Sequence, residues 1–189
     1  MERDRTATST TTHTAGPGED DLVAALWARD VRVFPKVRAQ RVLSDVELIR
    51  GLMTSAEARF QLAVIPLLLR QPTCDAAVVE VLATLSPPQR LTLTFYYQAA
   101  TYLQCLERDP LAADHPLRDH FSAELSLPAA SHVADQPGQL ERALLDTARL
   151  QARATGLDLN WAEAYWTAAR FALRKARHAA APDRSQPSH

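Results

Sequence analysis

Residues 86–107, SPPQRLTLTFYYQAATYLQCLE, constrain the fold more than any other part of the sequence. Within this stretch, residues 91–95 alternate apolar and polar side chains, which is typical of a β-strand. However, Ser86 is a good helix N-cap, Pro87 suits the first helical position, and Gln89 has the spacing of a capping box. No glycine, proline or asparagine follows Gln89 in the stretch. Because a helix accounts for about twenty residues and a strand only for a small part of them, length and caps predict a helix.

This predicted helix is apolar over more than half of its circumference, so we expect it to be the central and most buried helix. Glycine is scarce: the chain of 189 residues has five, and Gly16 and Gly18 lie in a polar N-terminal tail. A sheet needs tight turns that tolerate positive φ, so this scarcity argues against a β-rich fold, and the sequence has no glycine-rich phosphate loop. The fold class that we predict is all-α, a single-domain helical bundle of about seven helices.

Helix caps and breakers predict the other elements and the domain boundaries. Residues 1–18 and 181–189 are too polar to repay the entropy of ordering, so we expect disordered N- and C-terminal tails around a bundle domain at 19–180. Residues 109–137 hold four prolines and are expected to be an irregular excursion, either a boundary or a functional segment. Of the other helices, the first is expected at 19–34, and the second begins at a capping box formed by Ser44 and Glu47. The third begins near Ser55 and has a kink or break at Pro66, and the fourth has Thr73 as its N-cap. Three more are expected at 117–125, at 138–154 before Gly156, and from Asn160 to about residue 180.

Charge and cysteine content restrict the class of protein. The net charge of −1 gives no overall attraction to nucleic acid or to an anionic membrane, so a nucleic-acid role needs a local basic patch. The longest apolar run, 60–69, is shorter than the roughly 20 residues that span a bilayer, and the N-terminus has no apolar signal segment. Cys74 and Cys105 fit free, buried thiols, and no cysteine or histidine spacing fits zinc. We therefore expect a cytoplasmic protein with no membrane segment, metal or cofactor.

The last predicted helix offers the clearest candidate binding surface. Its basic residues recur at helical spacing and follow several aromatic residues, which suits nucleic acid or an acidic partner. The alternative is that cations gather at a helix C-terminus because the helix dipole favours them there. A second basic cluster, at 29–41, would enlarge the surface if both clusters shared a face, which the sequence leaves open. The candidates are Arg170, Arg174, Lys175 and Arg177 for nucleic acid or an acidic partner, and Trp161 and Trp166 for a protein interface.

Two further groups of side chains have a simple structural interpretation. A stripe of tyrosines could line a ligand pocket, but a packed core whose hydroxyls reach partners explains it as well. A cluster of acids and histidines is poorly spaced for a helical metal site, because a proline separates its histidines, so we expect a solvated acidic loop. The two groups are Tyr96, Tyr97 and Tyr102, and Asp109, Asp114, His115, Asp119 and His120.

The segment RDPLAADH, residues 108–115, has the form R-x6-H with a polar residue after the arginine. It resembles the R-x4-6-H signature of HEPN-type ribonucleases, which are small all-α bundles. The resemblance covers this motif alone. It implies that Arg108 and His115 would act on an RNA phosphodiester, usually at a dimer interface.

These patterns favour a non-enzymatic helical protein-interaction module, a small partner or regulatory subunit of a larger cytoplasmic assembly. The sequence motivates this hypothesis because it has no cofactor, phosphate-loop or nucleophile signature. The alternative is a nucleic-acid-binding regulator that uses the basic C-terminal helix, and the third hypothesis is a HEPN-like ribonuclease. The identity of a partner and the oligomeric state stay open at this point.

Overall fold

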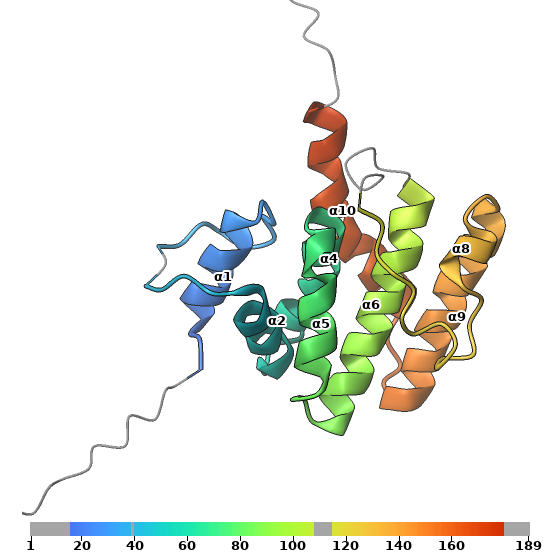
Figure 1. Ribbon diagram of the computed structural model, residues 1–189, viewed down its shortest axis with the longest axis horizontal. Coiled ribbons are helices and arrows are strands. Elements are labelled where there is room, and N and C mark those ends of the chain that lie inside the picture. Colours follow the sequence, from blue (N-terminus) through green and yellow to red (C-terminus); the bar gives the residue numbers. More distant parts are fainter. Residues whose placement is uncertain (1–15, 39, 108–114, 180–189) are drawn as a thin grey trace, which may run out of the picture.

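The computed structural model describes residues 16–38, 40–107 and 115–179 of the chain. Every regular element within these ranges is a helix, which confirms the predicted all-α fold class (Figure 1). The elements are α1 (Glu19–Ala28), α2 (Asp45–Thr54), α3 (Ala58–Leu62), α4 (Val64–Arg70), the 3₁₀ helix η1 (Pro72–Cys74), α5 (Asp75–Leu82), α6 (Pro87–Glu107), α8 (Ala130–Val133), α9 (Pro137–Thr155) and α10 (Trp161–Ala179).

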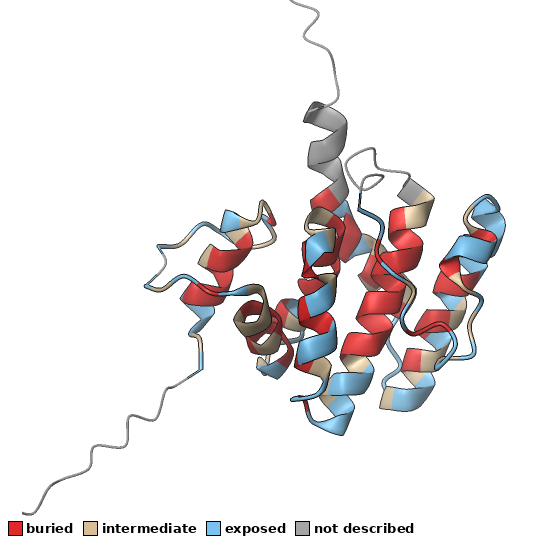
Figure 2. Ribbon diagram, in the orientation of Figure 1, coloured by how far each residue is buried: buried red, intermediate tan, exposed pale blue. Residues whose placement is uncertain are grey.

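Helix α6 lies at the centre of the bundle, as its apolar circumference predicts. It packs against α4, α9 and α10, and Figure 2 shows buried residues along most of its length. Its N-terminus has the predicted cap residues: the Ser86 backbone N–H and hydroxyl donate to the Gln89 side-chain oxygen at 3.2 and 2.7 Å. The helical interpretation of residues 91–95 is therefore confirmed.

The tyrosine stripe of α6 lies in the core. Tyr96, Tyr97 and Tyr102 are each at most 1% exposed. Their hydroxyl groups still find acceptors, since Tyr102 donates to the Pro128 carbonyl at 2.6 Å and the Tyr97 hydroxyl lies 2.6 Å from the Asp75 carboxylate. A buried hydroxyl needs such a partner, so the tyrosines help to place the segments that supply one.

Helix α1 ends well before residue 34, where the prediction placed its end. Asp30 has a left-handed backbone conformation, with φ of 60°. The Asp30 N–H donates to the Trp27 carbonyl at 3.1 Å, and the Val31 N–H donates to the Leu26 carbonyl at 2.9 Å. This Schellman arrangement satisfies the last carbonyls of the helix and turns the chain away. Glycine usually holds the left-handed position, so an aspartate there gave no stop signal.

The third predicted helix is in fact two helices, α3 and α4, with Ala63 between them. Pro66 has no backbone N–H, and its ring would clash with the carbonyl of Leu62 in a continuous helix, so the helix breaks one turn before the proline. The predicted break is therefore confirmed. The predicted N-cap at Thr73 is wrong, because this residue lies within η1 and no side chain caps α5.

Residues 115–129 form a strap that crosses α6 (Figure 1), and the helix predicted at 117–125 is wrong. Backbone N–H groups at both ends of the strap bind side chains, and in its middle the Leu125 N–H makes one bond of the α-helical type, to the Phe121 carbonyl at 3.0 Å. The Leu117 N–H donates to the Gln104 side-chain oxygen at 2.7 Å, and the two carboxylate oxygens of Asp119 accept backbone N–H groups at 3.1 and 2.7 Å. Side chains that take up backbone N–H groups in this way compete with helix formation.

Three other predicted helix ends are confirmed. At the start of α2, Ser44 and Glu47 form the expected capping box. Helix α9 ends at Gly156, whose φ of 65° is a conformation that glycine adopts without strain. At the start of α10, the Asn160 side chain accepts the Glu163 N–H at 3.2 Å.

Some predictions lie partly or wholly outside the described residues. Of the predicted tail at 1–18, only residues 16–18 are described, and there Pro17 lies against α2 beside Gly51. Residues 181–189 and 109–114 are outside the described ranges. Among the described helices, none is by itself long and apolar enough to cross a membrane. The segments α3–α4 and η1–α5, which are joined at a sharp bend, reach that length and apolar composition only when they are counted together.

The buried tyrosines predict a loss of stability at alkaline pH. Burial raises the pKa of Tyr96 and Tyr102 to about 12, and it also raises the pKa of Tyr97 and Tyr165. Because the folded pKa lies above the unfolded value of about 10, this stabilisation is complete below pH 10 and is lost as the pH rises through 12. We predict that the free energy of unfolding falls over this interval, measured by urea titration, with tyrosinate absorbance rising only as the protein unfolds. Tyrosines that ionise near pH 10 in a still-folded protein would contradict the prediction.

Candidate functional site

An open apolar groove lies between the loop that follows α1, the α3–α4 pair, and the first half of α10, which packs against α4. Its volume is about 460 Å³. Three parts of the chain that are distant in sequence therefore form one surface. The apolar residues that line it include Phe34, Pro35, Leu62, Pro66, Ala164 and Ala168.

Phe34 holds the loop wall of the groove in place. Its ring stacks on Phe60 of α3, with ring centroids 4.5 Å apart. Its backbone carbonyl accepts a hydrogen bond from the Trp27 indole N–H at 2.9 Å. The Arg59 guanidinium lies 5.5 Å from the Phe34 ring centroid and 5.4 Å from that of Phe60, within cation–π range. Both the backbone and the ring of Phe34 are fixed, so the wall is formed without a ligand.

Two carboxylates tie the rest of this loop to the bundle. The side chain of Asp21 in α1 accepts the backbone N–H groups of Gln40 and Arg41 at 3.0 and 3.2 Å. Asp30 pairs with Arg70 of α4 at 2.7 Å. Asp21 is only 8% exposed, and a buried carboxylate that lost these donors would be costly, so the loop is strongly held there.

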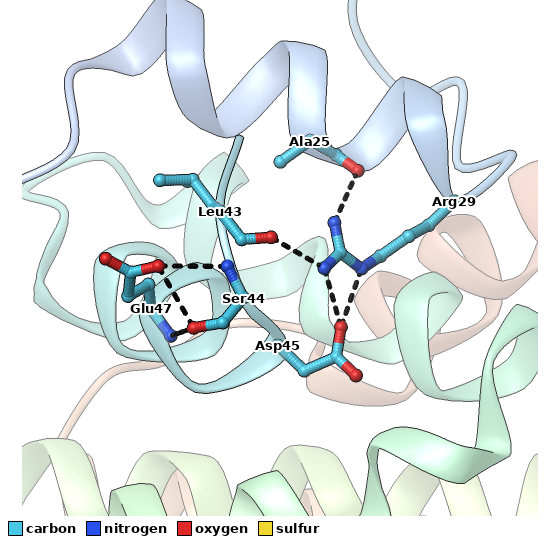
Figure 3. Close-up of polar contacts among 6 residues, drawn as sticks. All are labelled: Ala25, Arg29, Leu43, Ser44, Asp45 and Glu47. Atoms are coloured by element: carbon cyan, nitrogen blue, oxygen red, sulfur yellow. Dashed lines mark hydrogen bonds and ion pairs between the residues drawn. The ribbon is translucent and has the colours of Figure 1, made fainter. Parts of the chain in front are cut away.

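Arg29 fastens the end of α1 to the start of α2 (Figure 3). Its guanidinium donates to the backbone carbonyls of Ala25 and Leu43 at 3.1 and 2.9 Å, and it pairs with the Asp45 carboxylate at 2.6 Å. Ala25 lies in the last turn of α1, where a cation also suits the helix dipole. A single arginine thus fixes both ends of the loop that forms the groove wall.

The polar groups at the rim of the groove are engaged within the protein. Arg59 is hydrogen-bonded to Glu57. The Thr167 hydroxyl donates to the Glu163 carboxylate at 3.3 Å, and the side chain of Asn160 caps α10. A ligand in the groove therefore gains most from burial of its apolar surface and little from new hydrogen bonds.

Ion pairs neutralise most of the basic cluster predicted at 29–41. Three of its four arginines pair with acids of α2 or of the same loop, whereas Arg38 is exposed without a described ion pair, and Lys36 lies over the Trp27 ring at 5.9 Å. The ion pairs therefore reduce the free positive charge of this cluster to that of Lys36 and Arg38. The pairs are Arg29 with Asp45, Arg32 with Asp30, and Arg41 with Glu47.

The basic residues predicted on the last helix begin just beyond the groove. Arg170 is exposed and lies 4.0 Å from Glu163. Arg174, Lys175 and Arg177 follow on α10, but their side chains are outside the described part of the structure. Because the loop after α1 and the first half of α10 line one groove, the two predicted clusters belong to neighbouring segments. A binding role for the basic residues stays a prediction.

The two tryptophans predicted at a protein interface lie at the core or its edge. Trp161 is 7% exposed and packs against Tyr96, with ring centroids 6.4 Å apart. Trp166 is half-buried against the core. Neither residue lines the groove. Trp161 therefore has a packing role, and an interface role for the pair stays a prediction.

His115 lies at a second, polar hollow, whereas Arg108, its partner in the HEPN-like motif, is outside the described residues. The hollow has a volume of about 750 Å³ and is also lined by Asp75, Arg118 and His120. Within it, the His120 Nε2 atom lies 2.8 Å from the Asp75 carboxylate. The sequence gave no local signal for this pair, because the two residues are far apart in the chain.

The thiols are not candidate nucleophiles. Cys74 and Cys105 are free, as predicted; Cys74 is buried and Cys105 half-buried. Burial, with a smaller contribution from Asp45, raises the pKa of Cys74 to about 12, and burial also raises the pKa of Cys105. A protonated thiol is a poor nucleophile. In the described ranges, no group of three or more histidine, cysteine, aspartate or glutamate side chains is placed to hold a metal ion.

Comparisons with protein-family models, with curated proteins and with solved structures find no match to this chain. The groove and the hollow are therefore interpreted from their own chemistry. The groove suits apolar side chains, and the hollow suits a charged ligand.

Replacing Arg29 should destabilise the fold, because two backbone carbonyls and Asp45 lose their donor together. We expect Arg29→Met to lower the free energy of unfolding by about 2 kcal/mol, measured by urea titration with circular dichroism. The matched control is Arg149→Met, which breaks an exposed ion pair with Asp146 and should cost less than about 0.5 kcal/mol. Equal effects of the two substitutions would show that Arg29 does not fasten the loop.

Proposed function

We propose that the protein is a cytoplasmic, non-enzymatic helical interaction module, a small partner or regulatory subunit of a larger assembly, and that its groove binds a helical segment of another protein. The observation that carries this proposal is the apolar groove, whose walls are fixed by internal contacts and whose rim groups already have partners. The free thiols of Cys74 and Cys105 support a reducing compartment.

Apolar burial favours an amphipathic helix as the ligand. Such a helix binds a groove through apolar anchors that recur every three to four residues. Phe34, Leu62 and Pro66 offer an apolar surface to these anchors. With few uncommitted polar groups to orient a small polar molecule, the groove is better suited to side chains delivered on a rigid segment.

The ends of the chain are poor candidates to fill the groove themselves. Residues 1–15 contain Met1 as their single large apolar side chain, and residues 180–189 contain none. Burial yields about 25 cal/mol per Å² of apolar surface, so an occupant needs several large apolar side chains. Residues 1–15 and 180–189 therefore do not meet this need.

The charges near the groove favour a protein partner over nucleic acid. The ion pairs of Arg29, Arg32 and Arg41 reduce the positive charge that phosphate binding there would use. Arg170 and the basic residues that follow it on α10 fit acidic residues flanking the apolar anchors of the partner. Nucleic-acid binding through α10 and HEPN-like catalysis remain separate hypotheses.

Photocrosslinking from the groove tests this proposal. A photoreactive phenylalanine analogue at Thr167, which is exposed and lines the groove, should crosslink one protein partner in the native cells. The same analogue at Leu145, which is 46% exposed on α9 and outside the groove, should not. With the purified partner, Thr167→Arg should weaken binding at least about tenfold, because a charge would be buried in an apolar site. Leu145→Arg should leave the dissociation constant unchanged.

Three outcomes would contradict the proposal. Crosslinking to a second copy of this chain would identify the groove as a self-association surface. Equal crosslinking from Thr167 and Leu145, or none from either, would remove the groove as a docking site. Circular dichroism of each variant controls for loss of fold.

A further inference from the structure

The polar hollow is organised around the carboxylate of Asp75, the first residue of α5. One of its oxygens lies 2.6 Å from the Tyr97 hydroxyl of α6 and 2.8 Å from the His120 Nε2 atom of the strap. The other oxygen lies 3.8 Å from the Arg118 side chain. The carboxylate thus joins α5, α6 and the strap, and it sets the orientation of the side chains that face the hollow.

This geometry determines which nitrogen of His120 carries a proton. A carboxylate can only accept hydrogen bonds, so Nε2 of His120 must be the donor to Asp75. The Nδ1 atom makes no hydrogen bond to any described residue, and the side chain is 29% exposed. His120 is therefore held from one side and offers its other nitrogen to a ligand, as carboxylate-oriented histidines do.

The lining of the hollow has two chemically different parts. His115 and Arg118 supply nitrogen donors, and Thr73 adds a hydroxyl. The remaining lining is mostly apolar and includes Val79, which is 49% exposed. A ligand that carries an anionic group next to an organic group matches both parts.

The charge of Asp75 does not exclude an anion here. Its carboxylate is already hydrogen-bonded to His120 and lies against the Tyr97 hydroxyl. Arg118 is 81% exposed, and only its Nε atom is near Asp75. A guanidinium has five N–H donors in a planar fork, so its outer pair is available for a bidentate contact with phosphate.

We propose that this hollow binds a small organic phosphate ester. The phosphate group contacts the guanidinium of Arg118 and the imidazole of His115, and the organic group lies on Val79 and the prolines of the lining. The volume of about 750 Å³ is in the range of small-ligand sites. The hollow shares no lining residue with the apolar groove, so this proposal does not depend on the proposed function.

Calorimetric titration of the full chain with inorganic phosphate, phenyl phosphate and a single-stranded RNA tests the proposal. We expect phenyl phosphate to bind more tightly than inorganic phosphate, and Arg118→Gln and His115→Gln each to weaken its binding at least about tenfold. Val79→Ser should reduce the preference for phenyl phosphate over inorganic phosphate, because it removes apolar surface. Arg149→Gln, which changes an exposed arginine outside the hollow, is the matched control and should have no effect.

The site would be excluded if neither inorganic phosphate nor phenyl phosphate bound at a concentration of about 10 mM. Phenyl phosphate binding that Arg118→Gln leaves unchanged would exclude it as well. Tight binding of RNA without binding of phenyl phosphate would replace the small ester by a nucleic-acid backbone. Two-dimensional NMR of the imidazole nitrogens adds a second readout, since ligand binding should shift the Nδ1 signal of His120, which faces the hollow.

Discussion

The enclosure of α6 is the constraint on which the rest of the structure depends. A helix that is apolar on most sides must be covered on most sides, and α4, α9, α10 and the strap cover it. Its tyrosines add a second requirement, because each buried hydroxyl needs an acceptor. Asp75 and the Pro128 carbonyl meet that need, so the positions of α5 and of the strap follow partly from the polar ends of core side chains.

Both candidate sites are consequences of this enclosure. The hollow exists where the strap and α5 meet at the carboxylate that serves Tyr97, and this contact also orients His120. The groove exists where α10 and the α3–α4 pair, which pack against each other, meet the loop after α1. That loop has no regular structure, and Arg29, Asp21 and the stacked ring of Phe34 supply its rigidity.

Helix boundaries set by local residues could be predicted from the sequence. Helix ends and side-chain pairings that depend on tertiary contacts could not. Ser44, Pro66 and Gly156 act on their own helices, so their effects on helix boundaries could be read directly. The end of α1 could not, because Asp30 takes a position that glycine usually holds. The sequence shows no periodic pattern that links His120 with Asp75, because these residues are far apart in the chain and only the fold brings them together. Counting cations at 29–41 likewise suggested a basic patch, whereas Arg29, Arg32 and Arg41 have acidic partners in α2 and in the loop after α1.

The groove wall is formed before any partner binds, and hydrogen exchange of the free protein tests whether its loop is held. The probes are the Trp27 indole N–H and the backbone N–H groups of Gln40 and Arg41, which donate to Phe34 and to Asp21. We predict that these three protons exchange as slowly as the backbone N–H groups of α1. Exchange at the rate of an unfolded chain, with α1 still protected, would show that the loop is not held and that the groove is not preformed.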